Sequence, residues 1–585
     1  MLYGLYTWLW LNPSLYLIRG YREFFTDNYF FMELAGFPGG VAEYVSRLFI
    51  QFYNYPSIAA LLVFLCLATI YLSHVKVFDN KKFGWLISFL PVFILLLMRN
   101  DYGHAAQFDV NVLLLSVALL LFNTSLKCRW VFISFAYILL LVILLYLSGF
   151  FTAFTFVVVS LLIYALKKHK STGLYVMLAG TLAVLLLFYA LFSISYHDFV
   201  QEYTDITRIY SFRYYPLVLF ASIIAVPCLN SISASSPEVS RKSIGICLLI
   251  IPAVLLLLFL LSDKEERQSL RVQHFARNGE WEKTLQAARG CELPDKNMVY
   301  YTNEALYHTG RIYNELFSYS QSFGSDGLML AEMGTFSEIV PNQEIFMQLG
   351  ALSLSIIWGT EAVNVYGANP YVLHNLTKAY LAGGYVREAH KILNLLDRTL
   401  FQKKWVNKYR VIANDTALVK LDPELSRLQK SQTPLAVVSK QSPLTNLYLL
   451  SKETNLNKMA YNYLMIGTML DHQIENFVYC ASRLKEYGYT RIPKLYMEGL
   501  IYSALFSSSL PAEITELDYD NSILARFSAF RSELPMLQQN PREAKEILKR
   551  KYGDTYWYYL IFDSPLNDNE RVNIVMNMMP QTIKR

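Results

Sequence analysis

Charged residues are scarce in this 585-residue chain: they make up 17% of it, against 54% hydrophobic residues. Because soluble proteins usually carry about 25% charged residues, this scarcity argues against an ordinary cytosolic enzyme. The net charge is only +6, and the excess bases lie in short loops between apolar runs instead of forming a basic stripe or tail. The sequence therefore predicts no nucleic-acid partner.

Cysteines and catalytic motifs are also scarce. Of the six cysteines, only Cys291 and Cys480 lie in the more polar second half, so that half has one disulfide at most. The sequence has no paired-cysteine zinc spacing, no phosphate-binding glycine loop and no nucleophile elbow. These absences argue against the zinc, nucleotide and hydrolase classes that such motifs mark, and they leave the identity of any metal cofactor unknown.

Long apolar runs fill the first half of the chain. Residues 1–262 hold 27 charged residues, whereas residues 263–585 hold 71. A bilayer core requires about 20 mostly apolar residues per helix. Nine runs approach this requirement, at 2–18, 56–72, 85–98, 108–122, 130–147, 151–166, 174–194, 215–229 and 244–261. We therefore expect an all-α protein with a membrane helix bundle of about nine spans in residues 1–262, followed by a soluble domain in residues 263–585.

The first run is the weakest of the nine because Asn12 and Pro13 interrupt it. It is either a span or a segment that lies at the membrane interface. The orientation follows from the loops, since Lys and Arg in short loops stay cytoplasmic. Alternate loops contain ten bases, namely Lys76, Lys81, Lys82, Lys127, Arg129, Lys167, Lys168, Lys170, Arg241 and Lys242. This pattern predicts a cytoplasmic amino terminus and places residues 263–585 on the opposite face of the membrane.

The outer loops contain most of the acids of the membrane half. They hold nine of its 11 acids, namely Glu23, Asp27, Glu33, Glu43, Asp101, Asp109, Asp198, Glu202 and Asp205. Their six bases are all arginines: Arg19, Arg22, Arg47, Arg99, Arg208 and Arg213. The planar guanidinium of Arg binds phosphate or carboxylate through two parallel hydrogen bonds, which favours a ligand site. The alternative, at about equal weight, is that these arginines contact lipid head groups or neighbouring acids.

Two outer segments have distinctive patterns. After the turn at 37–40, apolar residues recur at helical spacing from Val41 to Phe52, which predicts an amphipathic helix along the outer membrane interface. The second segment is short enough to hold Arg99, Asp101, His104 and Asp109 close to the hydrocarbon boundary. Ionisable groups at such depth are costly and indicate function. The alternative is that these loop ends simply reach water, most of all at Asp109.

This layout resembles the C-type glycosyltransferase superfamily. The shared features are a long acidic first outer loop with an interface helix, a second acidic outer segment and a soluble carboxyl-terminal domain on the same face. The resemblance implies a polyprenyl-phosphate-linked sugar as donor. It also implies that an acid in an outer loop acts as a base or binds a metal. A divalent metal ion is therefore one possible cofactor. The chain lacks the tight Asp-Asp, Asp-x-Asp or Glu-x-Asp pair of that superfamily.

The resemblance assigns roles to individual residues of this chain. Glu23 or Asp27 is the candidate catalytic base, and Asp101 or Asp109 is the second catalytic acid. The candidate phosphate ligands are Arg99, Arg208 and Arg213, with His104 beside them. A carboxylate can activate an acceptor hydroxyl, and Arg can stabilise the charge on a leaving phosphate.

A second resemblance extends along the whole chain. The segments FPGGVAEYVSRLFIQFYNYP, NPYVLHNLTKAYLAGGYVREAHKILNLL and NKMAYNYLMIGTMLDHQIENF resemble an uncharacterised Bacteroidota family of multi-span membrane proteins with a helical-repeat tail. That family implies no activity. The resemblance implies a bacterial inner membrane as the location, with residues 263–585 in the periplasm.

The second half of the chain has the pattern of paired helices. The unit from Pro370 to Leu396, with its Gly383-Gly384-Tyr385 turn, resembles a tetratricopeptide repeat. Similar turns are expected at Gly279 and Gly310, and further helices at 455–470, 472–487, 493–507 and 540–552. We expect a degenerate α-solenoid whose concave face holds a protein or peptide. The alternative is a domain that only caps the membrane part.

Three hypotheses about function follow. The first is an inner-membrane glycosyltransferase that moves a sugar from a polyprenyl-phosphate donor to an acceptor presented by the repeats. The second is a non-enzymatic membrane scaffold whose repeats bind envelope proteins. A transporter is third, because transporters need charged or broken spans near the midplane, and the interiors of these runs contain essentially no charge.

Overall fold

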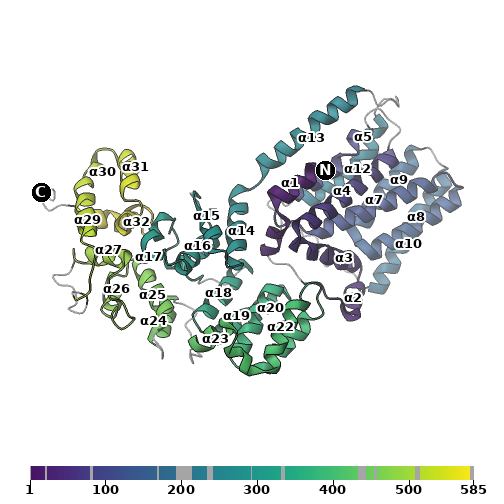
Figure 1. Cartoon of the computed structure of the whole chain (residues 1–585). Coiled ribbons are helices and arrows are strands. Elements are labelled where there is room, and N and C mark those ends of the chain that lie inside the picture. Colours follow the sequence, from purple (N-terminus) through teal and green to yellow (C-terminus); the bar gives the residue numbers. More distant parts are fainter. Residues whose placement is uncertain are drawn as a thin grey trace. The chain divides into compact units, whose positions relative to one another are not determined.

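Every regular element that the computed structural model describes is a helix (Figure 1). The described residues are 2–19, 23–78, 84–167, 170–192, 214–232, 241–291, 293–330, 336–432, 443–452, 457–506, 514 and 516–579. Extended pairing within them is limited to two isolated bridges, Phe25 with Thr399 and Arg491 with Asp518. The prediction of an all-helical protein is therefore confirmed.

The chain divides into two compact units. Unit 1 comprises Met1–Asp263 and Asp397–Lys403, and unit 2 comprises Lys264–Leu396 and Lys404–Arg585. The assignment of residues 1–262 to a membrane and of residues 263–585 to its outer side stays a prediction.

Unit 1 contains the apolar helices. They are α1 (Leu2–Tyr6), α2 (Asn28–Ala35), α3 (Gly40–Gln51), α4 (Pro56–Phe78), α5 (Gly84–Ile87), α6 (Leu90–Met98), α7 (Ala106–Ser125), α8 (Trp130–Ser148), α9 (Phe150–Leu166), α10 (Ser171–Phe192), α12 (Tyr215–Ile232) and α13 (Arg241–Leu261). Among the described residues, four helices are long and apolar enough to cross a membrane: Pro56–Val77, Ala106–Ser125, Trp130–Ser148 and Ser171–Phe192. Shorter apolar helical segments lie at Gly84–Met98, Phe150–Leu166, Tyr215–Leu229 and Pro252–Leu261. The chain thus has the composition of a membrane-associated protein.

Helix α7 lies at the centre of unit 1 and packs against α3, α4, α8 and α9. Its residues Leu115, Leu119 and Phe122 share one face at helical spacing and are almost completely buried. The Phe122 ring contacts the rings of Tyr137 on α8 and Phe156 on α9, with centroids 6.1 and 6.0 Å apart. These contacts hold the three helices around one apolar core.

Two of the nine predicted spans are broken. Residues 2–19 form α1, a π-helix turn (Thr7–Leu11) and a 3-10 helix (Pro13–Arg19), because Asn12 takes a left-handed backbone with φ +49° before Pro13. The run 85–98 divides into α5 and α6, and Pro91 lies in the first turn of α6. Proline has no N–H to continue a preceding helix, so the chain turns between Ile87 and Leu90.

The predicted amphipathic helix at 41–52 forms as α3. It begins after Gly39, whose φ of +89° suits glycine, and Gly40 lies so close to α2 that a Cβ atom there would be 1.7 Å from the Leu34 carbonyl oxygen. Helix α3 packs against α7 and α8 and buries its small residues Ala42 and Ser46. Its position at a membrane interface stays a prediction.

A short segment from the second half of the sequence belongs to unit 1. Residues 397–403 pair with the loop before α2, where the Thr26 amide and hydroxyl both donate hydrogen bonds of 2.8 Å to the Arg398 carbonyl. The Phe401 ring lies 5.8 Å from that of Phe52 and 5.2 Å from that of Tyr55. No sequence motif marked this contact.

Unit 2 consists of shorter helices joined by tight turns. They are α14 (Lys264–Arg277), α15 (Trp281–Ala288), α16 (Lys296–His308), α17 (Ile312–Glu315), α18 (Phe336–Gln348), α19 (Leu352–Tyr366), α20 (Pro370–Ala382), α21 (Val386–Leu396), α22 (Lys403–Asn414), α23 (Pro423–Ser431), α24 (Pro443–Lys452), α25 (Lys458–Leu470), α26 (Ile474–Ala481), α27 (Lys494–Ser503), α29 (Ser522–Glu533), α30 (Met536–Gln539), α31 (Pro541–Tyr552), α32 (Tyr556–Phe562) and α33 (Asp568–Met578). The predicted turns at Gly279, Gly310 and Gly384 are present, each with positive φ, and α20 packs on α21 as expected.

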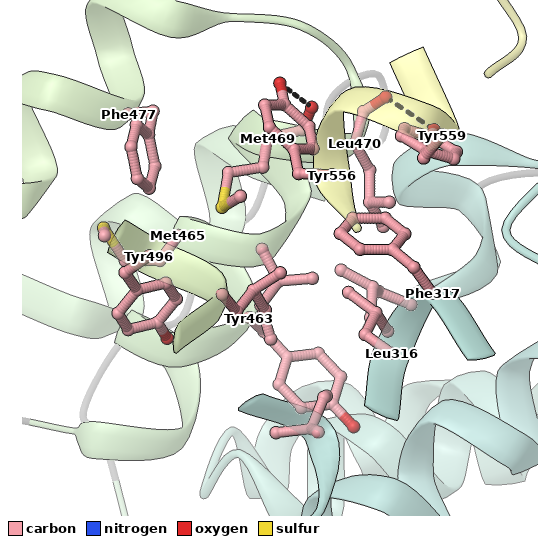
Figure 2. Close-up of a cluster of buried hydrophobic side chains, with 14 of the residues drawn as sticks. Leu316, Phe317, Tyr463, Met465, Met469, Leu470, Phe477, Tyr496, Tyr556 and Tyr559 are labelled. Atoms are coloured by element: carbon pink, nitrogen blue, oxygen red, sulfur yellow. Dashed lines mark hydrogen bonds between the residues drawn. The ribbon is translucent and has the colours of Figure 1, made fainter. Parts of the chain in front are cut away.

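Tyrosine side chains build much of the core of unit 2. Figure 2 shows part of it, where Tyr556 and Tyr559 of α32 donate hydrogen bonds of 2.9 Å to the carbonyls of Met469 and Leu470 at the end of α25. The Phe317 ring stacks on Tyr559 with centroids 5.0 Å apart. A buried tyrosine stabilises the fold when its hydroxyl has a partner, and here the partners are the carbonyls of the last two residues of α25.

Two acids and one arginine are buried together in unit 2. Glu304 of α16 is 3% exposed and Glu344 of α18 is 4% exposed. The Arg277 Nε lies 3.6 Å from a Glu344 oxygen and donates a 3.1 Å hydrogen bond to the Tyr301 hydroxyl. Burial, with the neighbouring Glu344 carboxylate, raises the pKa of Glu304 to about 8. The folded protein therefore retains a proton on this pair at neutral pH.

This pair predicts that stability falls as pH rises. Unfolded Glu releases its proton near pH 4.3, whereas folded Glu304 retains it to about pH 8, so the folded state gains protons relative to the unfolded state between these values. We expect unfolding free energy to decrease by roughly 3 kcal/mol from pH 5 to pH 8, measured as the thermal midpoint by circular dichroism in detergent. Glu304→Gln should flatten this dependence, whereas Glu280→Gln, on a side chain 40% exposed, should retain it. Equal pH profiles for wild type and Glu304→Gln would contradict this.

Candidate functional site

The candidate site is a buried polar cluster in unit 1 where α6 ends and α7 begins. Arg99 follows α6, and its Nη1 forms an ion pair with Oδ2 of Asp109 in the first turn of α7. Its Nη2 donates a 2.9 Å hydrogen bond to the Tyr53 hydroxyl. His104 Nε2 lies 2.9 Å from the same Asp109 oxygen. The side chains of Arg99, His104 and Asp109 are only 4%, 1% and 9% exposed.

The loop between α6 and α7 presents these side chains through a fixed turn. The Asp101 carboxylate accepts a 2.7 Å hydrogen bond from the Gly103 amide, and the Asp101 carbonyl accepts one of 3.1 Å from the His104 amide. This side-chain turn is typical of Asp between two helices. It directs His104 back toward Asp109, so that residues only five apart share a hydrogen bond.

The first apolar run secures the same loop from another side. The Tyr6 hydroxyl donates a 2.7 Å hydrogen bond to Asn100 Oδ1, and Asn100 Nδ2 donates one of 2.9 Å to the Leu258 carbonyl of α13. The Tyr16 hydroxyl donates to the Arg99 carbonyl. Residues near both ends of unit 1 in the sequence therefore converge on Arg99 and Asn100.

A cavity of about 150 Å³ adjoins the cluster. Its walls are apolar side chains of α3, α4 and α7, including Val45, Phe49, Leu62 and Cys66, and its polar wall is Arg99 with Asp109. Among the described residues, Arg99 Nε and Asp109 Oδ1 have no hydrogen-bond partner. The cluster thus retains one donor and one acceptor beside an apolar space.

The structure distributes the predicted catalytic and phosphate-binding residues over different places. Arg99, His104 and Asp109 come together as one cluster. Asp101 shapes the loop beside them, with its side chain bonded to the Gly103 amide. Arg208 and Arg213 lie outside the described residues.

The two acids of the first loop have other surroundings. Asp27 caps α2, since its Oδ1 accepts a 2.8 Å hydrogen bond from the Phe30 amide, and its Oδ2 lies 3.7 Å from Arg398 Nη1. Glu23 is 2% exposed and directly precedes Phe24, which packs with Phe30 in a small aromatic cluster. Asp27 therefore has a structural role in starting α2.

The sequence alone did not predict that Tyr53, Asn100 and Tyr16 are polar partners of this cluster and its loop. Tyrosines in a segment near a membrane boundary are also typical of an interfacial aromatic belt. Their presence there therefore did not indicate a site. The one indication that the sequence offered for these partners was that Asn100 directly follows Arg99. Among the described residues, no group of three or more His, Cys, Asp and Glu is arranged to hold a metal ion.

The Arg99–Asp109 pair yields a stability prediction. Asp109→Asn removes the negative charge and leaves a buried guanidinium without compensation, which typically costs about 3–5 kcal/mol. We expect a clear drop in the thermal midpoint of the detergent-solubilised protein. The double variant Arg99→Met with Asp109→Leu should recover much of it, because no buried charge remains.

The matched control is Asp27→Asn, since Asn caps a helix about as well as Asp. This variant should change the midpoint little. If Asp109→Asn is no more destabilising than Asp27→Asn, the buried pair does not have the energetic role inferred from its burial.

The comparisons with known proteins identify a family and no activity. No curated protein and no solved structure matches the chain. The profile of a family described as "Family of unknown function (DUF6057)" matches residues 1–563, which include all described helices of unit 1 and most of those of unit 2. The chain belongs to this family of unknown function.

Proposed function

We propose that the chain is a multi-pass glycosyltransferase of a bacterial inner membrane that uses a polyprenyl-phosphate-linked sugar as donor. The observation that carries the proposal is the buried Arg99–Asp109 pair on the wall of an apolar cavity. A donor of this kind combines an apolar chain with an anionic phosphate, and the site combines an apolar wall with a guanidinium. Arg is the side chain best suited to bind phosphate.

The phosphate of the donor takes the place of Asp109 as partner of Arg99. Asp109 remains next to His104, 2.9 Å from its Nε2, and accepts the proton of an acceptor hydroxyl. A bond forms between the acceptor oxygen and the anomeric carbon, and the bond from that carbon to the phosphate oxygen breaks. The electron pair stays on the polyprenyl phosphate, whose charge Arg99 stabilises. The free Asp109 Oδ1 supports this role for Asp109 over Asp27, whose carboxylate caps α2.

The membrane arrangement belongs to the same proposal. The shorter apolar helices add spans to the four long ones, and the Lys-rich loops lie in the cytoplasm. Unit 2 is then a tetratricopeptide-like α-solenoid in the periplasm, and its paired helices bind the protein or peptide acceptor.

The second candidate function is a non-enzymatic scaffold that recruits envelope proteins through unit 2. The observation in its favour is that Asp27 and Glu43 are both engaged in structural contacts, Asp27 as a helix cap and Glu43 in an ion pair with Arg47 one turn away. In that case the Arg99 cluster would serve only to hold α6 and α7 together.

Arg99→Lys tests the proposal while keeping the positive charge. Lys cannot form the paired hydrogen bonds of a guanidinium, so we expect at least tenfold weaker binding of farnesyl phosphate to the full-length protein, measured by native mass spectrometry in detergent. Arg47→Lys is the matched control, since Arg47 pairs with Glu43 on α3, and it should bind as wild type does. Release of polyprenyl phosphate from a polyprenyl-phosphate hexose should be lost in Asp109→Asn. Equal binding by wild type and Arg99→Lys, or no release by wild type, would favour the scaffold, whereas release unaffected by Asp109→Asn would contradict the role of Asp109 as base.

A further inference from the structure

Helix α2 presents large apolar side chains at the surface of unit 1. Three of its five exposed residues are large and apolar: Tyr29 is 77% exposed, Met32 69% and Phe31 43%. The opposite face of the helix buries Phe30 and Leu34 in a cluster with side chains of α3. A surface helix that faces water usually carries polar residues on its outer face, so the exposed face of α2 is suited to a partner less polar than water.

The helix that the sequence predicts at the membrane interface, α3, has no such face. Every residue of α3 is buried or half-buried, because α3 packs against α2, α7 and α8. Of the two helices, α2 is therefore the one that can contact a molecule outside unit 1.

Contacts with α8 fix α2 at one end of a membrane-length helix. The Tyr146 hydroxyl of α8 donates a 2.7 Å hydrogen bond to the carbonyl of Ala35, the last residue of α2. The Gly39 amide donates one of 2.9 Å to the Tyr146 carbonyl, and a Cβ atom on Gly39 would lie 3.5 Å from Gly149, the residue that joins α8 to α9. The 19 residues of α8 give it a length of about 29 Å, close to the thickness of a bilayer core. The end of α2 therefore lies level with the boundary of a bilayer that α8 spans.

The charged residues around α2 limit its depth and indicate the kind of lipid. Glu33 of α2 is exposed, and Oδ2 of Asp27, which caps the helix, lies 3.7 Å from Nη1 of Arg398, whose side chain is 60% exposed. Such groups are costly within hydrocarbon, whereas tyrosine is enriched at head-group level. Arg398 pairs with Asp27, and Arg47 pairs with Glu43. Because the bases beside α2 have acidic partners, this surface suits a zwitterionic lipid.

We propose that α2 is an interfacial helix that inserts Tyr29, Phe31 and Met32 among phospholipids at the bilayer boundary beside the end of α8. The inference rests on the membrane arrangement within the proposed function, and it requires neither the sugar donor nor the role of Asp109. Helix α2 packs on α3, which leads to Tyr53 and its hydrogen bond with Arg99. The lipid contact thus holds the segment before Tyr53 at the level of the bilayer boundary.

Photocrosslinking from α2 tests this contact in the full-length protein, reconstituted in phosphatidylcholine vesicles. In Tyr29→Bpa (Bpa, p-benzoylphenylalanine), the irradiated ketone takes a hydrogen atom from a neighbouring C–H group and the two carbon radicals join. We expect a phosphatidylcholine adduct on the peptide that contains position 29, measured by mass spectrometry. The matched control is Tyr479→Bpa, on a tyrosine of α26 that is 56% exposed, and it should give about fivefold less lipid adduct. Met32→Bpa, on the same face of α2, repeats the test if the Tyr29 variant does not fold.

A position on α8 calibrates the depth. Leu139 is 48% exposed and lies at the midpoint of α8, about 14 Å from either end. Leu139→Bpa should also give a phosphatidylcholine adduct, and fragmentation should place its new bond farther from the glycerol than the bond formed from position 29. Equally deep bonds from the two positions would overturn the interfacial placement of α2.

The remaining outcomes separate this inference from the proposed function. If position 139 gives a lipid adduct while position 29 gives none, or crosslinks to a peptide of this chain or of a second copy, the inference is wrong and the membrane arrangement stands. If neither position gives a lipid adduct, the membrane arrangement fails together with the inference. Glycosyl transfer is tested separately by Arg99→Lys and Asp109→Asn, so it can fail while the lipid contact of α2 stands.

Discussion

The buried positive charge of Arg99 is the constraint on which the arrangement of unit 1 depends. An isolated ion costs several kcal/mol to remove from water even after relaxation, so a guanidinium 4% exposed requires an anion beside it. Asp109 supplies the anion from the first turn of α7, and the contact sets the position of α6 relative to α7. His104 and Tyr53 complete the cluster, which therefore fixes the loop between these helices and the start of α4.

The same cluster explains why the broken first run packs where it does. A helix interrupted at Asn12 leaves backbone groups without intrahelical partners, and such groups are costly away from water. The side-chain hydroxyls of Tyr6 and Tyr16 in this run donate hydrogen bonds to the loop that carries Arg99. The irregular run thus lies against an irregular loop.

The sequence predicted the long helices well because an apolar run bounded by polar loops allows few alternatives. The run at 108–122 became α7, and 130–147 became α8. It also selected Arg99, His104 and Asp109 as candidates, since ionisable residues between two apolar runs are costly there, and the structure brings these three side chains together. It did not distinguish Asp109 from Asp101 as the partner of Arg99. That choice depends on the rotational phase of α7, which directs Asp109 inward, and on the turn that occupies Asp101 with the Gly103 amide. Nor did it indicate Tyr53, because the approach of Tyr53 to Arg99 depends on how the preceding helix α3 packs against α7.

The two buried clusters of charged side chains in this chain differ in how their charges are balanced. In unit 2, Glu304 and Glu344 share a single Arg277, so negative charge is in excess and a proton held to about pH 8 compensates it. In unit 1, the charges of Arg99 and Asp109 balance. Two of their polar atoms still lack a hydrogen-bond partner among the described residues, the guanidinium donor Nε and the carboxylate acceptor Oδ1, and an apolar cavity adjoins them. A proton satisfies the first cluster without any ligand. In the proposed function, the lipid phosphate supplies an anion for the free donor of the second cluster, and the acceptor alcohol supplies a hydroxyl for its free acceptor.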